Sequence, residues 1–178
     1  MSGAAGGDRA RLFFALWPDV TVRDSLAALA AAAQAECGGR MTARENIHLT
    51  LFFAGDIERG RIGVLEDAAA SLSTVPFDLV LDRLGRWRHN NIVWAGASTC
   101  PTALAALAAD LHGALERAGV QGDTRPYVPH ITLVRNATRG PAAASLSPCA
   151  WGARELALVE SVPAAGGVRY DVRARWPL

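Results

Sequence analysis

Two short segments that lie far apart in the chain repeat one pattern of residues. Residues 46–53 and 128–135 each contain a His, an aliphatic residue, a Thr and a Leu in that order. In both segments polar residues alternate with apolar ones. This alternation is typical of β-strands, in which successive side chains point to opposite faces. The pattern predicts two strands that each expose an imidazole beside a hydroxyl, His48 with Thr50 and His130 with Thr132, over a buried aliphatic face. Two copies with the same parity indicate that the chain holds both strands across a common space.

The size and charge of the chain limit the classes of protein to which it can belong. Its 178 residues suit one domain, and a net charge of +1 leaves no overall positive field to attract long nucleic acid. All 18 cationic residues are Arg. A GC-rich genome explains this bias, although Arg also suits planar phosphate groups better than Lys does.

Neither the cysteines nor the apolar segments indicate export or membrane insertion. Cys37, Cys100 and Cys149 are odd in number and widely spaced, which predicts reduced thiols in an intracellular protein and no paired-cysteine metal site. The Gly/Ala-rich first residues lack the charged start of a signal peptide, and the Ala/Leu segment 26–35 is too short to span a bilayer. We therefore expect a cytoplasmic protein without membrane contacts.

The spacing of apolar residues predicts an α+β fold, with strands covered by helices, in one domain over residues 11–178 after a flexible tail at 1–10. The first helix is expected to begin at Thr21, with Asp24 as its capping-box partner, and to end at Gly38. The predicted elements are, in order, strand 11–17, helix 21–37, strand 46–53, a turn at 55–56, helix 58–73, strands 77–84 and 92–95, helix 101–118, strand 128–135, a loop or weak helix at 140–148, and strands 153–161 and 168–176. A helix of similar length precedes each His strand, which suggests an approximate internal duplication.

Paired His and Thr side chains favour acid–base catalysis on a phosphodiester. Imidazole titrates near pH 6.5, so one His can accept a proton while the other donates one. Hydrolysis needs a base for the attacking water and an acid for the leaving oxygen, and the Thr hydroxyls can donate hydrogen bonds to the non-bridging oxygens. Only Glu45 lies within two to four residues of either His as a further metal ligand, so a two-His mechanism is favoured over a metal site.

The paired His-x-Thr strands resemble the signature of the 2H phosphoesterases, and within them the RNA 2',3'-cyclic phosphodiesterase family, also called 2'-5' RNA ligases. The likeness covers nearly the whole chain, and the segments that carry it are 11–16, 45–51, 129–135, 158–161 and 176–178. It implies a bilobal α+β fold in which two antiparallel β-sheets face a central cleft, with helices on the outer faces. The lobes would be related by a pseudo-two-fold axis, and each would supply one motif.

The resemblance also implies an activity, the hydrolysis of an RNA terminal 2',3'-cyclic phosphate to a 2'-phosphate without metal or cofactor, with reverse 2'-5' ligation possible. His48 would protonate the departing 3'-oxygen as general acid and His130 would activate water as general base. Strand parity treats both His alike and does not assign these roles. Thr50 and Thr132 would hold the phosphate. The partners would be RNA ends or nucleotides that carry a 2',3'-cyclic phosphate, bound by a monomer.

For two further candidate binding residues, strand alternation and a binding role do not agree simply. Arg135 matches an Arg that follows the family's second motif and would bind phosphate, yet alternation puts it opposite His130 unless the strand ends or bulges there. Phe52 shares the predicted face of His48, where it could stack on a nucleobase or close the edge of the core. The loop residues that could border the cleft are Trp87, His89 and Tyr127. Simple packing or exposure is the better interpretation of these three.

The sequence leaves two other functions open. The chain could be a 2H phosphoesterase that acts on another cyclic or 2'-5'-linked nucleotide, such as ADP-ribose cyclic phosphate or 2'-5' oligoadenylate. A catalytically idle RNA- or nucleotide-binding module could keep the same cleft, although the presence of both His and both Thr argues against this.

Overall fold

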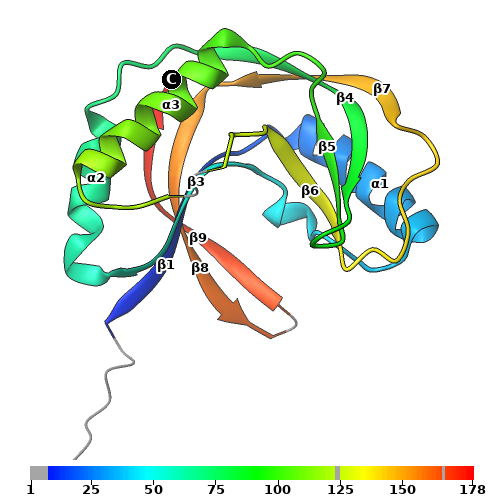
Figure 1. The fold of residues 1–178 in the computed structure, drawn as a ribbon, viewed down its shortest axis with the longest axis horizontal. Coiled ribbons are helices and arrows are strands. Elements are labelled where there is room, and N and C mark those ends of the chain that lie inside the picture. The colour runs from blue at the N-terminus through cyan, green and yellow to red at the C-terminus, as the bar shows by residue number, and fades with distance from the viewer. Residues whose placement is uncertain (1–7, 123–124, 166) are drawn as a thin grey trace, which may run out of the picture.

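Alternating apolar residues build one antiparallel sheet that is divided into two lobes (Figure 1). The computed structural model describes residues 8–122, 125–165 and 167–178. The elements along the chain are β1 (Arg9–Leu16), α1 (Val20–Cys37), β2 (Arg40–Met41), the 3-10 helix η1 (Arg44–Asn46), β3 (Leu49–Glu58), the 3-10 helix η2 (Arg59–Arg61), α2 (Ile62–Ala70), β4 (Phe77–Trp87), β5 (Ile92–Gly96), α3 (Thr102–Arg117), β6 (His130–Arg135), β7 (Ser145–Ala153), β8 (Glu155–Ala164) and β9 (Gly167–Pro177).

The strand order shows how the two lobes are joined. Hydrogen bonds connect the strands in the order β7-β4-β5-β6-β3-β1-β8-β9, with β2 paired to β6. We call β3, β1, β8 and β9 the first lobe, and β7, β4, β5, β6 and β2 the second lobe. The lobes meet where β3 pairs with β6, through the one residue pair Leu49 and Ile131. The two predicted sheets are thus two halves of a continuous sheet, joined at the two strands that carry the His motifs.

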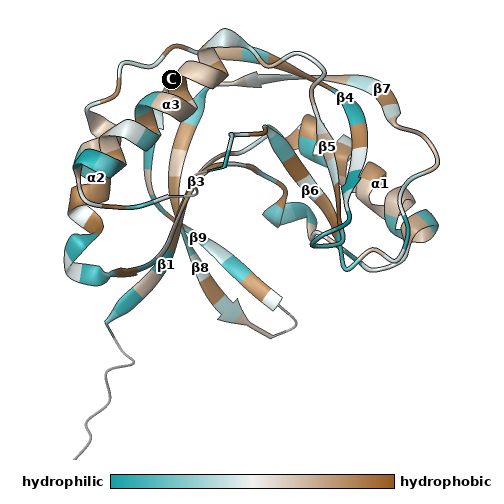
Figure 2. Ribbon diagram, viewed as in Figure 1, coloured by the Kyte–Doolittle hydropathy of each residue, from teal (hydrophilic) through white to brown (hydrophobic). Residues whose placement is uncertain are grey.

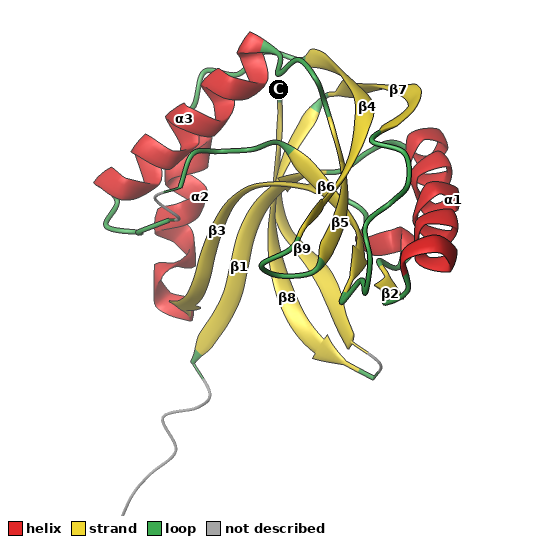
Figure 3. Ribbon diagram, turned by 45° about the vertical axis from the view of Figure 1, so that its right-hand side comes forward, coloured by secondary structure: helices red, strands yellow, loops and turns green. Residues whose placement is uncertain are grey.

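The helices lie on the outer sides of the sheet and are exchanged between the lobes (Figure 3). Helix α1 follows β1 of the first lobe in sequence but packs on β2, β6 and β7 of the second lobe. Helix α3 follows β5 of the second lobe but packs on β3 of the first lobe, beside α2. Each His strand is therefore supported from behind by the helix that precedes the other His strand.

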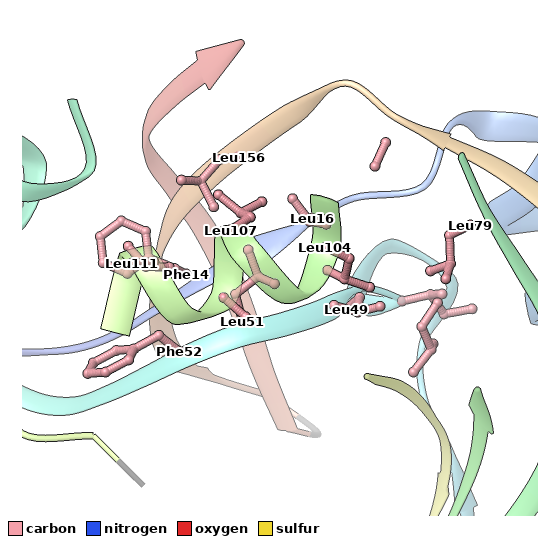
Figure 4. Close-up of a cluster of buried hydrophobic side chains, with 14 of the residues drawn as sticks. Phe14, Leu16, Leu49, Leu51, Phe52, Leu79, Leu104, Leu107, Leu111 and Leu156 are labelled. Atoms are coloured by element: carbon pink, nitrogen blue, oxygen red, sulfur yellow. The ribbon is translucent and has the colours of Figure 1, made fainter. Parts of the chain in front are cut away.

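The core lies between the sheet and these helices. Figure 2 shows hydrophobic segments where β1, β3 and β8 run together, and Figure 4 shows side chains of α3 meeting those of β1 and β3. Leu104, Leu107 and Leu111 recur on one side of α3, as its apolar spacing predicts, and all three are buried. They belong to the same cluster as Phe14 and Leu51. The first-lobe sheet thus has one face in the core and one face toward the other lobe.

Several element boundaries differ from the predictions. Helix α1 begins at Val20, because the Asp19 carboxylate accepts a hydrogen bond from the Val22 N–H at 2.9 Å and caps the helix in place of Thr21. Strand β1 begins at Arg9, inside the predicted tail, whose residues 1–7 lie outside the described part of the chain. The predicted turn at 55–56 is a bulge within β3, where Gly55 has a φ of 73°.

Strand β7 was not predicted, since its first half falls in the expected loop at 140–148. It is an edge strand of the sheet, and most of its residues are exposed or half-buried. An edge strand tolerates Pro148 and needs no regular alternation of apolar residues. The usual sequence signals of a strand are therefore weak in this segment.

A glycine fixes the short strand β2 against β6. Gly39 has a φ of 86°, and a Cβ there would lie 2.4 Å from the Arg135 carbonyl oxygen. We expect Gly39→Ala to lower the free energy of unfolding by about 1–3 kcal/mol. The reasons are that a positive φ is unfavourable for Ala and that the added Cβ would clash with a backbone atom. Gly63→Ala is the matched control: it lies in α2 with nothing within 4 Å of the added Cβ, so stability should rise by up to about 1 kcal/mol. Urea unfolding of both variants measures this, and equal stabilities would contradict it.

Candidate active site

The pairing of β3 with β6 brings the two His-x-Thr segments together. Because the strands are antiparallel and Leu49 lies opposite Ile131, the register puts His48 level with Thr132 and Thr50 level with His130. Residues opposite each other in such a pair share a face of the sheet. Leu49 and Ile131 are fully buried, whereas the four polar residues are half-buried. The predicted juxtaposition of two imidazoles and two hydroxyls is thus present in the structure.

Both imidazoles are held by the same backbone contact. Nδ1 of His48 lies 2.7 Å from the carbonyl oxygen of Asn46, and Nδ1 of His130 lies 2.8 Å from that of Val128. A carbonyl oxygen only accepts, so each Nδ1 carries the hydrogen and each neutral ring has its lone pair on Nε2. Nε2 of His48 lies 3.0 Å from the hydroxyl oxygen of Thr50 and accepts its hydrogen bond. Both Nε2 atoms are therefore in the form that a general base requires.

Aromatic rings surround His48. Trp17 stacks on the imidazole with centroids 4.9 Å apart and 20° between planes, and Phe13 lies at 5.0 Å. Tyr170 meets the ring edge-on at 5.2 Å. The Trp17 indole N–H donates to the carbonyl oxygen of Glu45 at 3.2 Å, which fixes the stacking ring. Burial in this cluster lowers the pKa of His48 to about 4, and the positive charge of Arg135 adds to the decrease.

The environment of His130 is similar in kind but more open. Trp87 approaches its ring edge-on, with centroids 4.4 Å apart and 71° between planes. Burial also lowers the pKa of His130 below its usual value, and the charge of Arg135 acts in the same direction. Both imidazoles are therefore neutral in the ligand-free protein. Because the surroundings of His48 are more apolar, it is the harder of the two to protonate.

A bulge one residue after each Thr changes which later residues face the cleft. On β3, Phe14 pairs with Phe52 but Ala15 pairs with Thr50, so Leu51 is an extra residue. On β6, Val93 pairs with Val134 but Trp94 pairs with Thr132, so Leu133 is an extra residue. The burial pattern that follows is the same in both strands, two buried residues and then an exposed one.

The second bulge accounts for Arg135. Simple alternation put Arg135 behind the strand, whereas after the bulge it lines the same cavity as His48 and His130. The guanidinium forms no hydrogen bond or ion pair with the described residues. Arg135 is thus on the side of the sheet where a phosphate would bind, as the family resemblance implied and parity alone did not.

The first bulge moves Phe52 away from the predicted face. Phe52 is 3% exposed and packs in the core with Phe14, and Figure 4 shows it beside Leu51 near α3. The interpretation that Phe52 closes the core edge is therefore favoured over stacking on a base. Phe53, which sequence reasoning missed, occupies the position equivalent to Arg135, is 45% exposed and lines the cavity.

A cavity of about 1430 Å³ connects these residues. It contains both His, both Thr and Arg135, and it is also bordered by Trp87 at the end of β4 and by the loop residues His89 and Tyr127. The Tyr127 hydroxyl donates to the carbonyl oxygen of Thr50 at 3.2 Å, which ties the loop before β6 to the first motif. Trp87, His89 and Tyr127, for which the sequence favours simple packing or exposure, therefore form part of the cavity wall.

Within the described part of the chain, no group of three or more His, Cys, Asp or Glu side chains is placed to hold a metal ion. The three cysteines are free thiols and do not cluster.

Every helix of the described residues is too short or too polar to span a bilayer.

Comparison with known proteins agrees with this geometry. A family model described as the 2'-5' RNA ligase superfamily matches residues 22–161. The chain belongs to this superfamily. The RNA 2',3'-cyclic phosphodiesterase of Escherichia coli (strain K12) is 33% identical over 172 residues, which cover 94% of this chain and 96% of that protein. The RNA 2',3'-cyclic phosphodiesterase of Archaeoglobus fulgidus is 23% identical over 139 residues, or 76% of this chain and 78% of that one.

Solved structures of the same superfamily confirm the predicted fold. The crystal structure of E. coli LigT complexed with 3'-AMP matches with a TM-score of 0.90 at 31% identity, covering 96% of this chain and 99% of that chain. The bilobal α+β arrangement, a 2H phosphoesterase fold, is therefore correct for this member. The aromatic neighbours of His48 went unnoticed in the sequence, because Trp17 and Tyr170 come from distant segments that carry no motif.

The low pKa of His48 predicts a specific pH dependence of stability. Its pKa is about 4 in the folded protein and about 6.5 in the unfolded chain, so protons bind the unfolded state first as the pH falls. The contribution of the His48 imidazole to the free energy of unfolding is fully present above about pH 6.5 and is lost as the pH falls toward 4. We expect wild type to lose about 2 kcal/mol more than His48→Gln between pH 7 and pH 5. Urea unfolding at both pH values tests this, and identical losses would show that the ring is not shielded from protonation.

Proposed function

We propose that this member of the superfamily is a metal-independent hydrolase that opens the 2',3'-cyclic phosphate of RNA ends or nucleotides to give a 2'-phosphate. The observation that carries the proposal is the pair of imidazoles whose Nδ1 atoms both contact a backbone carbonyl, each ring level with a Thr of the opposite strand at the β3–β6 junction. A phosphorus atom between them would have an acid on one side and a base on the other. In-line displacement requires that arrangement.

The roles of the four side chains follow the family allocation. His130 accepts the proton of the attacking water, and the water oxygen bonds to phosphorus. The bond from phosphorus to the 3'-oxygen breaks, and His48 gives its proton to that oxygen. Thr50 and Thr132 donate hydrogen bonds to the non-bridging oxygens as they gain charge. The names of the E. coli and A. fulgidus relatives support this choice of substrate.

The protonation of His48 in this scheme depends on the substrate. A general acid must carry a proton, yet both His have lowered pKa values in the ligand-free protein. A bound cyclic phosphodiester brings a negative charge between the rings, and a nearby opposite charge favours the imidazolium. The stacked Trp17 also stabilises a cation on its face. Substrate binding and the uptake of one proton are therefore coupled in the proposed mechanism.

We further propose that the protein acts in the cytoplasm as a monomer. The three cysteines are free thiols, which suits a reducing compartment. All residues of the proposed site come from a single chain, so a second copy is not needed to complete it.

Removal of either imidazole should abolish turnover. We expect His48→Ala and His130→Ala to lower kcat for adenosine 2',3'-cyclic phosphate by about 10²–10⁴-fold, since each removes one proton transfer. EDTA should leave the wild-type rate unchanged. His112→Gln is a control for loss of a cavity histidine that belongs to neither motif, because His112 lies on α3 and pairs with Glu116.

Chromatography of the product separates the alternatives. Adenosine 2'-phosphate is the expected product, and formation of the 3'-phosphate would reverse the assigned leaving group. Full activity of the two His→Ala variants would refute acid–base catalysis, and loss of activity in EDTA would refute metal independence. Faster turnover of 2'-5' oligoadenylate than of the cyclic nucleotide would assign a different phosphoester as the substrate.

The lowered pKa values also predict the pH profile. The profile of kcat/KM reports the free enzyme, in which one His must be protonated and the other neutral. Because both pKa values lie below the usual value of about 6.5, the optimum of kcat/KM should lie below about pH 6.5. The optimum of kcat should lie at higher pH, because bound phosphate raises both pKa values. Initial rates between pH 4 and pH 9 test this, and coinciding optima would contradict the coupling.

A further inference from the structure

Two glycines of the second lobe leave room for the ring of Trp94, where strands β4, β5 and β6 lie side by side (Figure 1). Gly85 in β4 is the direct partner of Trp94 in β5, and Gly96 lies two residues further along β5. A Cβ on Gly85 would lie 2.3 Å from Cζ2 of Trp94, and a Cβ on Gly96 would lie 2.9 Å from Cζ3. Neither glycine has a positive φ. The indole ring, and not the backbone conformation, therefore excludes a side chain at both positions.

This arrangement of Trp94 has a cost in stability. Glycine weakens the interior of a strand, because it brings no side chain to pack and gives the unfolded chain more freedom. The Nε1–H of Trp94 is buried and has no hydrogen-bond acceptor among the described residues, and an unsatisfied buried donor is unfavourable. A smaller apolar residue at this position would avoid both costs. The presence of Trp94 therefore indicates a role beyond the packing of the lobe.

Trp94 contacts a second tryptophan, which reaches the cavity. Trp87 lies two residues after Gly85 and on the same face of β4, and its ring centroid is 5.6 Å from that of Trp94, with 38° between the planes. Trp87 lines the cavity, whereas Trp94 and both glycines are not among the described residues that line it. The Trp94 ring thus supports Trp87 from outside the cavity.

The ring of Trp87 in turn contacts the imidazole of His130. The two ring centroids are 4.4 Å apart, with 71° between the planes. The imidazole is also held at Nδ1, which lies 2.8 Å from the carbonyl oxygen of Val128. A single hydrogen bond leaves a ring free to tilt about it, so the edge-on contact with Trp87 supplies a second restraint. The two contacts together fix the direction of Nε2.

Trp87 also influences the solvation of this imidazole. Burial has the largest effect on the pKa of His130, which it lowers, and the ring contact with Trp87 contributes to that burial. The charged or titratable groups of the cavity on the elements around His130 are His48 before β3, His89 after β4, Tyr127 before β6 and Arg135 in β6. Trp94 and Gly96 of β5 carry no charge. A substitution of Trp87 therefore changes the exposure of the imidazole to water and leaves these charges in place.

We infer that Trp87 is a positioning residue for the general base, and that it holds the His130 imidazole with Nε2 directed at the reacting centre. Trp94, seated on its two glycines, keeps Trp87 in place. This inference rests on the proposed function, in which His130 activates the attacking water. Misplacement of a reacting group by about 1 Å can cost about 10²-fold in rate, so a residue outside the cavity can affect the reaction through two successive ring contacts.

A substitution outside the cavity tests this connection. Gly85→Ala is compatible with the backbone, but its Cβ must displace the Trp94 ring. We expect kcat for adenosine 2',3'-cyclic phosphate to fall about 10- to 100-fold, with KM unchanged because every cavity-lining residue is kept. Gly152→Ala is the matched control in β7 of the same lobe, since its Cβ would meet only the end of the Arg154 side chain, which can move. It should keep the wild-type kcat.

Substitutions of Trp87 itself test the contact directly. Trp87→Leu removes the ring beside His130 and should lower kcat about 10- to 100-fold. Trp87→Phe keeps an aromatic edge at this position and should recover part of the loss. Trp87 is half-buried at the end of its strand, so these variants should fold even if Gly85→Ala does not. A wild-type kcat in Trp87→Leu would overturn the inference.

Titration of the histidines by NMR gives a readout that does not depend on turnover. His48→Gln and His130→Gln assign the two imidazole signals, which are then followed between pH 4 and pH 9. In Trp87→Leu and Gly85→Ala the pKa of His130 should rise toward its usual value, because water reaches the ring. The pKa of His48 should stay as in wild type, because its aromatic neighbours are Trp17, Phe13 and Tyr170.

The titration and the rates together separate the possible outcomes. An unchanged pKa of His130 in Trp87→Leu, or equal changes at both histidines, would overturn the positioning role of Trp87. Failure of wild type to hydrolyse adenosine 2',3'-cyclic phosphate would instead refute the proposed function, while the titration would still decide whether Trp87 holds the His130 ring.

Discussion

The active-site geometry depends on one backbone pairing, that of Leu49 with Ile131. These residues lie between His and Thr in their motifs and are fully buried, so the hydrophobic effect and the β-ladder act on the same two positions. A slip of one residue would turn every polar side chain of one motif to the wrong face. The half-sheets diverge on either side of this pair, which leaves room for the cavity beside it. Buried aliphatic residues thus determine where the His and Thr side chains of the two motifs meet.

The site combines features that oppose each other electrostatically. Aromatic neighbours and Arg135 hold the imidazoles neutral in the ligand-free protein, although one must be protonated to act as an acid. A bound phosphate relieves this conflict, because its negative charge favours the imidazolium. The ligand-free site is therefore preorganised for an anion at some expense in stability.

The sequence predicts the positions of the candidate catalytic residues more reliably than those of the residues around them. Strict alternation places His48, Thr50, His130 and Thr132 correctly, because those strand segments are regular. It fails just beyond each Thr, where one extra residue reverses the parity. Phe52 then enters the core, while Arg135 turns to the cavity. A bulge has no fixed sequence signal when both residues at it are apolar, as they are here. The edge strand β7 escaped notice for a related reason, since exposed strands need no alternation.

The exchange of helices between the lobes has a consequence for how the molecule can be divided. Because α1 covers the second lobe and α3 covers the first, each half of the sequence supplies the hydrophobic support of the other half. A fragment ending between β3 and β4 would expose the apolar back of its own strands and carry a helix with nothing to cover. Each helix packs on one lobe but is joined in sequence to a strand of the other, so relative movement between the lobes must bend these connections as well as the strand junction.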